Sequence, residues 1–416
     1  MTSKEKLQKC LAHESGPVPM DFGGTAVSGI HCSVVEALRA HYGLEKRAVK
    51  IIDPYQMLGE IDNDLKEVLG IDVIGVFPRN TLFGFPLGSW KEWRTPWGQE
   101  VLVSEDFNTT QQGDDVLIYP EGDTSAPASG RMPGSGYFFD SIVRQPPIEE
   151  EKLNPEDNLE EFEYVTDEDL GYYESALREA DATGLGVIAN FGGTAFGDIA
   201  LVPAPFLKKP KGIRDVTEWY VSTVMRPDYI HAIFEGQSEI AIANLDKIFQ
   251  RVGNLPDAVF ICGTDFGTQD SQFCSTDTFN TLYAPYYKKV NNWIHEHTEW
   301  KTFKHSCGAV LPFMEHFIDS GFDIINPVQC SAAGMDPQNL KDSYGGRLVF
   351  WGGGVDTQQT LPFGTPDEVK KEVTERLEIF TRDGGYVFDA IHNVQAKTPI
   401  ENMAAMFDAV REFRSN

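Results

Sequence analysis

The sequence AVFICGTDFG (258–267), followed by FNTLYAPYYKKVNNWIHEHT (279–298) and TFKHSCG (302–308), contains one complete strand–helix–strand unit. Its two apolar runs are short and bounded by glycine, as in buried parallel strands, and the segment between them has the length of a helix. A polar turn follows each strand. This stretch therefore predicts a parallel βαβ unit whose strands end in residues capable of chemistry.

The same alternation runs along most of the chain. It predicts eight strands, at Val18–Phe22, Asp72–Phe77, Gly186–Phe191, Ala258–Gly263, Thr302–His305, Asp323–Val328, Leu348–Trp351 and Tyr386–Ile391. Helices are predicted over residues 166–182, 215–224, 227–250, 279–298, 309–320 and 365–382. We therefore expect an α/β fold, a (β/α)8 TIM barrel whose polar turns gather on the C-terminal rim, where barrel active sites are built.

Two segments interrupt this rhythm. Residues 80–145 are rich in aromatic residues, glycine and threonine, and predict a β-hairpin insertion after the second strand that lies over the active-site rim. Residues 201–215 predict a further loop, placed as a lid. Residues 1–416 are otherwise expected to form a single barrel domain.

Charge and composition narrow the classes of function. The chain has 35 lysines and arginines against 63 aspartates and glutamates, a net charge of −28 that disfavours nucleic acid as a partner. Its N-terminus is charged, and we find no apolar run of membrane-spanning length. The six cysteines show no disulfide spacing, so we expect reduced thiols and a cytoplasmic protein without a membrane association.

A metal site is predicted at two neighbouring strand ends. His305 and Cys307 end the fifth predicted strand, and Cys330 ends the sixth. Because adjacent parallel strands lie about 4.8 Å apart, the imidazole and two thiolates can converge on one zinc ion with an open fourth position. The alternatives are a thiol nucleophile assisted by His305, and cysteines that merely pack as small hydrophobic residues.

Further candidates lie at other strand ends. Asp265 is a candidate general acid or base, a fourth metal ligand, or only the cap of its turn. His392 is expected to form hydrogen bonds at the rim rather than to bind the metal. Residues expected to line the substrate pocket, unless they serve as caps or core, are Asp21, Phe22, Asn190, Phe191 and Asn393.

Several motifs together resemble the uroporphyrinogen decarboxylase-like superfamily. They are VPMDFGG (18–24), CGTDFGTQ (262–269), FKHSCGAV (303–310), GFDIINPVQCSAAGMDPQNLK (321–341), GGGVDTQQTLPFGTPDEV (352–369) and GYVFDAIHNVQAKTPIENMAAM (385–406). The arginine-rich N-terminal motif of the decarboxylases is missing. The chain is more similar to the zinc-dependent, corrinoid-linked methyltransferases, including the first-step methyltransferases of bacterial O-demethylase systems.

The resemblance implies a specific activity. A methyl group would pass from a small methylated donor, a methoxylated aromatic ether, to the cob(I)alamin of a corrinoid protein, with zinc as cofactor and a homodimer as a possible assembly. In thiol-methylating relatives the third zinc ligand follows the last barrel strand, where this chain reads IHNVQ (391–395), so Cys330 is the expected third ligand. Alternatives are a methyl-corrinoid:thiol methyltransferase, a uroporphyrinogen decarboxylase-type lyase, and a non-enzymatic corrinoid-handling scaffold.

Overall fold

A seven-stranded parallel sheet forms the centre of the molecule in the computed structural model, which describes residues 1–415. The strands follow the order β15-β14-β13-β12-β11-β10-β3, so neighbours along the chain are neighbours in the sheet. Their bounds are β3 Val73–Val76, β10 Gly186–Ala189, β11 Ala258–Cys262, β12 Lys301–His305, β13 Ile324–Asn326, β14 Val349–Trp351 and β15 Tyr386–Val387. This sheet confirms the predicted α/β class and barrel-like fold.

The first predicted strand differs from the other seven. Residues 18–22 form only an isolated parallel bridge, Met20 to Phe388, and not a regular strand. The Asp21 N–H donates to the Phe388 carbonyl at 2.9 Å, and the Asp72 N–H donates to the Met20 carbonyl at 2.8 Å. The segment therefore lies between the two edges of the sheet, joined to both by backbone hydrogen bonds.

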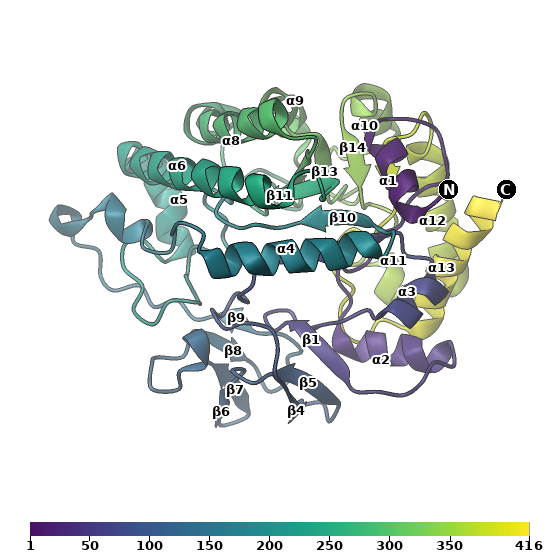
Figure 1. Cartoon of the computed structure of the whole chain (residues 1–416), viewed down its shortest axis with the longest axis horizontal. Helices are drawn as coiled ribbons and strands as arrows, with labels where there is room; N and C mark the ends of the chain where they lie inside the picture. Colours follow the sequence, from purple (N-terminus) through teal and green to yellow (C-terminus); the bar gives the residue numbers. More distant parts are fainter. Residues whose placement is uncertain (416) are drawn as a thin grey trace.

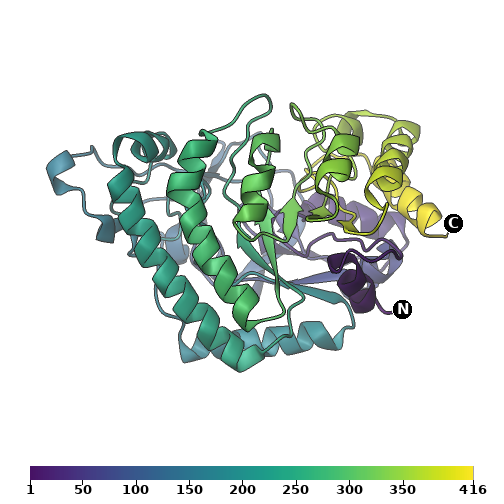
Figure 2. The same ribbon diagram turned by 90° about the horizontal axis from the view of Figure 1, so that it is seen from above.

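Helices surround the sheet in chain order, from α6 in teal to α13 in yellow (Figure 2). Thr166 and Thr365 form capping boxes at the starts of α4 and α12, because each hydroxyl accepts from the backbone three residues on. The helix predicted over 309–320 is shorter, comprising η5 Leu311–Phe313 and α9 Met314–Asp319. The other outer helices are α2 Cys32–His41, α3 Asn63–Leu69, α4 Asp167–Ala182, α5 Val216–Met225, α6 Pro227–Val252, α8 Ala284–His297, α10 Pro337–Tyr344, α11 Thr360–Phe363, α12 Pro366–Phe380 and α13 Ile400–Ser415.

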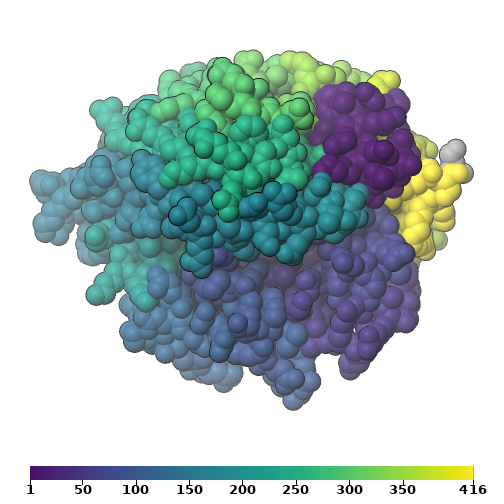
Figure 3. Space-filling view, viewed as in Figure 1, coloured from purple at the N-terminus to yellow at the C-terminus, as the bar shows by residue number. Residues whose placement is uncertain are grey.

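Helix α1 (Ser3–Leu11) closes the amino-terminal end of the sheet. Its Leu7 is fully buried and packs with Val73, Ile188 and other inward-facing strand residues. A Cβ at Gly186 would lie 2.3 Å from a Leu7 methyl carbon, so only glycine lets the helix approach this closely. The N-terminal segment (purple) borders the C-terminal helix (yellow) on the face shown in Figure 3.

Two smaller sheets lie together on the opposite side of α4 from α6 (Figure 1). One has the order β2-β1-β5-β4, and the other β6-β7-β8-β9. Strand β1 pairs in parallel with β5, so residues before the second barrel strand and residues within 80–145 share one sheet. The bounds are β1 Val49–Asp53, β2 Leu58–Gly59, β4 Trp90–Arg94, β5 Glu100–Ser104, β6 Thr109–Gln112, β7 Asp115–Ile118, β8 Gly130–Met132 and β9 Asp140–Ser141.

Among the helices of residues 1–415, none combines the length and the apolar composition that a membrane crossing requires.

Candidate metal centre

His305 ends β12 on the inward face of the sheet. Side chains alternate along a strand, so His305 faces the same way as Phe303, which belongs to the buried inward-facing core. The imidazole is 3% exposed, and its Nδ1 lies 2.6 Å from Asn326 Oδ1. With the Nδ1 proton on this bond, the Nε2 lone pair is free. Burial lowers the pKa of His305 to about 4, which keeps the ring neutral near pH 7.

Cys307 stands beside that free nitrogen. Its Sγ lies 3.4 Å from His305 Nε2, and its backbone N–H donates to Asp265 Oδ1 at 2.6 Å. The same carboxylate oxygen is 3.8 Å from His305 Nε2. Burial, and then the negative charge of Asp265, raise the pKa of the Cys307 thiol well above its usual value. Without a cation the sulfur therefore stays protonated at neutral pH, which disfavours a free thiolate nucleophile.

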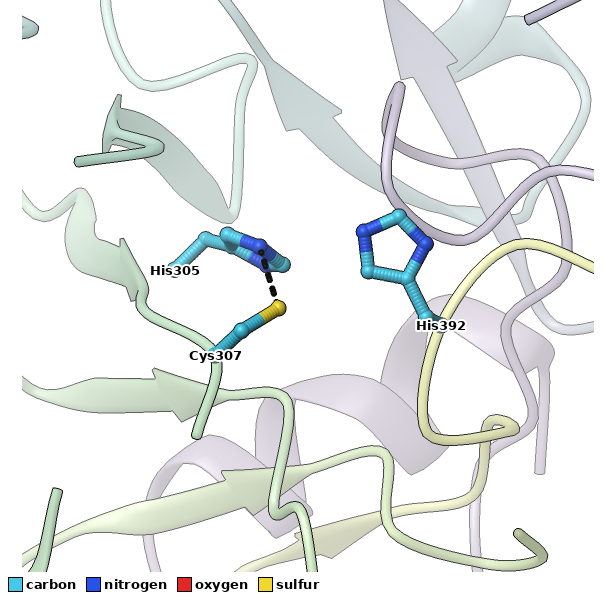
Figure 4. A group of neighbouring side chains, drawn as sticks. All are labelled: His305, Cys307 and His392. Carbon is cyan, nitrogen blue, oxygen red and sulfur yellow. Dashed lines mark hydrogen bonds between the residues drawn. The ribbon is translucent and has the colours of Figure 1, made fainter. Parts of the chain in front are cut away.

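His392 supplies the third ligand atom of this cluster. One ligand atom each from His305, Cys307 and His392 lies within 4.8 Å of the other two. Figure 4 shows the His392 ring on a loop of its own, facing the other two side chains. The Asn393 N–H donates to His392 Nδ1 at 2.8 Å, which places the proton of a neutral ring on Nε2. If His392 bound a metal through Nε2, the ring proton would move to Nδ1. The hydrogen bond from the Asn393 N–H to Nδ1 would then be lost.

Cys330, the predicted third ligand, lies outside this cluster. It is not among the ligand atoms that converge at His305 in the described part of the chain. The charged groups that influence its thiol are Arg376 and Glu372 of α12 and Asp336 before α10. Strand β13 ends at Asn326, four residues earlier, and Cys330 lies near these helix residues after the intervening turn. His392, predicted to be only a hydrogen-bonding residue, takes its place in the cluster.

The donor set fits zinc. Two imidazoles and one thiol are nitrogen and sulfur donors that zinc prefers, and tetrahedral Zn–N and Zn–S bonds place ligand atoms about 3.3 to 3.6 Å apart. The His305–Cys307 separation of 3.4 Å falls in this range. Asn326 holds His305 as outer-shell partners of zinc-bound histidines do. Three protein ligands would leave one coordination position for a substrate atom.

Most residues predicted to line the substrate pocket make contacts with other parts of the fold. Phe22 is fully buried and packs on Phe407 at 5.1 Å between ring centroids, and Phe191 packs on Tyr173. Asp21 is buried, accepting from the Gly24 N–H and from the Trp351 indole. Each of the three side chains therefore has contacts within the fold, and their place in a substrate pocket stays a prediction.

The two predicted asparagines also have partners. Asn393 is 1% exposed and accepts from the Gly29 N–H at 2.5 Å, while its amide donates to the Ala26 carbonyl at 2.8 Å. It therefore joins the segment after the last strand to the N-terminal loop, and its place in a substrate pocket stays a prediction. Asn190 is half-buried at the end of β10 and accepts from the Gly192 N–H at 2.9 Å, so it remains the pocket candidate of the set.

A second carboxylate near Asp265 was missed by the sequence prediction. Asp198 lies in the loop after β10, and burial, followed by the charge of Asp265, raises its pKa to about 6. The same two carboxylates act on Tyr220 of α5, whose buried hydroxyl has no hydrogen-bond partner among residues 1–415. The segment after residue 190 lacks a strand-end motif at Asp198, so no spacing rule could have found it.

Comparison with known proteins defines the class. The family model described as uroporphyrinogen decarboxylase (URO-D) matches residues 200–413, more than half of the chain. The protein therefore belongs to the uroporphyrinogen decarboxylase family. A comparison with curated proteins gives no significant match.

Solved structures agree on the fold. A methyltransferase from Methanosarcina mazei is similar over 99% of both chains, with a TM-score of 0.55 and 15% sequence identity. At that identity the likeness concerns the fold alone. A GH113 beta-1,4-mannanase gives a TM-score of only 0.27 with 10% identity, covering 58% of this chain and 79% of its own, and carries no argument.

Proposed function

We propose that the protein is a zinc-dependent methyltransferase that moves a methyl group from a small methyl ether to the cob(I)alamin of a corrinoid protein. The observation that carries the proposal is the convergence of His305, Cys307 and His392 at the strand ends of a URO-D family chain. Similarity in fold to the Methanosarcina mazei methyltransferase supports the same class of reaction. The resemblance described above favours a methoxylated aromatic donor.

The overall reaction balances as R–O–CH3 plus Co(I) plus a proton, giving R–OH and methyl-Co(III). The C–O bond breaks, and the two electrons of Co(I) form the new Co–C bond. The oxygen leaves as an alkoxide or phenoxide and needs positive charge or a proton. A zinc ion held by His305, Cys307 and His392 would supply Lewis acidity toward this leaving oxygen.

Asp265 is our proposed proton carrier. Its Oδ1 fixes the Cys307 backbone, and burial raises the pKa of its carboxyl, so protonation near neutral pH is easier than for a solvated aspartate. Asn326 positions the His305 ring, and Asn190 is the remaining polar group for donor binding at the rim. The corrinoid partner would approach the same rim, since the amino end is closed by α1.

Three other functions remain as alternatives. Methyl transfer from a methyl-corrinoid to a thiol would use the same metal to lower the pKa of the incoming thiol. A decarboxylase-type lyase of the same family needs no metal at this position. A corrinoid-handling scaffold would hold the metal without turnover.

The test combines metal content and turnover. Purified protein is expected to contain about one zinc per chain by elemental analysis, a stoichiometry the three-ligand set predicts. Incubation with a corrinoid protein reduced to Co(I) and a panel of aromatic and aliphatic methyl ethers should convert the Co(I) absorbance to that of methyl-Co(III). A chelator should abolish the conversion, and added zinc should restore it. Metal-free protein with full activity would contradict the proposal.

A further inference from the structure

The loop that carries Cys307 lies directly against the loop that follows β11. A Cβ at Gly308 would lie 2.4 Å from the carbonyl carbon of Gly267, and the φ of Gly308 is +87°, so this position requires glycine. The Ala309 N–H donates to the Thr268 carbonyl at 2.8 Å. The two loops are therefore in backbone-to-backbone contact beside the candidate metal ligand.

Both peptide groups that adjoin Cys307 have a side-chain acceptor. The Cys307 N–H donates to Asp265 Oδ1 at 2.6 Å, and the Gly308 N–H donates to Gln329 Oε1 at 2.8 Å. Because a peptide group is planar, holding the groups on either side of a Cα holds its φ and ψ and therefore the direction of its Cβ. Only the χ1 rotation then remains to place the sulfur.

Gln329 extends this contact to a second glutamine. Its Nε2 donates to Gln269 Oε1 at 2.9 Å, and Gln269 Nε2 donates to the Ser331 carbonyl at 2.6 Å. We call the hydrogen-bonded series from the Gly308 N–H to the Ser331 carbonyl the amide relay. A backbone donor at one end and a backbone acceptor at the other allow one orientation for each glutamine amide. Gln329 is also buried, at 7% exposure, so its carbonyl oxygen has little access to solvent.

We propose that the amide relay positions the Cys307 sulfur toward His305 for metal binding, with Gln329 as the positioning residue. The inference rests on the zinc site of the proposed function. The relay joins the loops that follow β11, β12 and β13, and it holds Cys307 where its Sγ is 3.4 Å from His305 Nε2. Without the acceptor on Gln329, the peptide group after Cys307 is free to turn, and the sulfur leaves the separation that zinc requires.

Two substitutions of Gln329 separate hydrogen bonding from packing. Methionine keeps the length of the side chain but is a weak acceptor, whereas glutamate keeps the acceptor for the Gly308 N–H. Competition with a fluorescent chelator should give Gln329→Met a zinc affinity about 10- to 100-fold below that of the wild type. Gln329→Glu should stay within about 3-fold, because the Gln269 amide can turn to donate to the second carboxylate oxygen. The reverse order of the two variants would assign Gln329 to packing and overturn the proposal.

Hydrogen exchange of the metal-free protein gives a readout that needs neither zinc nor turnover. The peptide segment that contains Gly308 should exchange about 2- to 12-fold faster in Gln329→Met, the range of one net hydrogen bond. Gln269→Met breaks the relay at its exposed end and should give a smaller increase. Adding Gln269→Met to Gln329→Met should give no further increase, because both act on one hydrogen-bonded series.

A surface glutamine supplies the matched control. Gln338 of α10 donates to Asp342 at 2.7 Å, and Gln338→Met should match the wild type in both measurements. Unchanged exchange in Gln329→Met, or faster exchange with an unchanged zinc affinity, would overturn the proposal. A wild-type protein that binds no zinc would contradict the proposed function, whereas the exchange rates would still decide whether the relay orders the Cys307 loop.

Discussion

The inward face of the parallel sheet has two layers of opposite character, and the same strands contribute to both. Near the amino ends, Phe303, Ile324 and Val387 form an apolar layer against α1. Two residues further along the chain lie His305 and Asn326, at the ends of β12 and β13, and Asp389, just after β15. Because side chains alternate, a step of two residues keeps the direction and moves the side chain about 6.8 Å toward the rim.

Within this one sheet, the apolar layer serves stability and the polar layer serves chemistry. Phe303, Ile324 and Val387 have no hydrogen-bonding side-chain groups and pack in one cluster with residues of the N-terminal helix, so they contribute mainly by burial. The polar layer holds groups with shifted pKa values, and Asp389 has neither carboxylate oxygen hydrogen-bonded within the described residues. Such incompletely paired groups reduce stability and are characteristic of functional sites.

The largest effect is expected at the rim. Cys307→Ser removes the proposed sulfur ligand, so zinc binding should be lost and methyl transfer should fall about 1000-fold, corresponding to several kcal/mol of lost Lewis-acid stabilisation. Elemental analysis measures the zinc content, and the Co(I) assay measures methyl transfer. Cys330→Ser is the matched control and should keep zinc and activity. Loss of zinc in the Cys330 variant alone would restore the original ligand prediction.

In the apolar layer the expected loss is in folding stability. Phe303 is fully buried and contacts Phe260 and Trp351 at 5.3 Å between ring centroids. Phe303→Ala should lower the free energy of unfolding by about 3–5 kcal/mol through lost burial and a cavity. Denaturant titration measures the loss, while zinc content of the folded protein should be unchanged. Zinc loss without destabilisation would show that the two layers are not separate.

A smaller effect is expected where the layers meet. Asn326→Ala removes the acceptor that fixes the His305 ring and should weaken zinc affinity about 10- to 100-fold, as outer-shell changes typically do. Competition with a fluorescent chelator gives the affinity. Asn339→Ala, on the exposed face of α10, serves as a surface control and should match the wild type. An unchanged affinity in Asn326→Ala would mean that packing alone orients His305.

The smallest effect concerns pH. Burial, and then the charge of Asp21, raise the pKa of Asp389 well above that of an unfolded aspartate. The folded state therefore holds this proton over a pH range in which the unfolded chain has lost it. The contribution of Asp389 to stability is greatest below about pH 4 and declines as the pH rises toward its folded pKa. Unfolding curves of Asp389→Asn at several pH values should show a shallower decline than the wild type, whereas parallel curves would assign the proton elsewhere.

Much of the fold followed from local pattern. Short apolar runs predicted the seven strands of the central sheet, and the helices predicted from residues 166 and 365 begin directly after the capping residues Thr166 and Thr365. The segment 18–22 has the same apolar pattern but forms only a bridge. An apolar sequence pattern indicates which residues are buried. A segment between two sheet edges is buried whether or not it forms a regular strand.

Local sequence pattern predicts only part of the candidate ligand set. His305 and Cys307 are two residues apart at one strand end, so their proximity follows from the sequence. Cys330 and His392 each follow a strand end by several residues, and the turn between decides which way the side chain points. A histidine after the last strand was the available signal for a third ligand, because zinc accepts imidazole as well as thiolate.

By itself, the sequence determined the order of strands and helices, the inward direction of every second strand residue, and the proximity of His305 to Cys307. These features depend on neighbours along the chain. Only the tertiary structure decided that His392 rather than Cys330 lies beside His305 and Cys307, and that Phe22 and Asn393 are buried. Those outcomes depend on the curvature of the sheet and the path of its loops, which bring together residues up to several hundred positions apart.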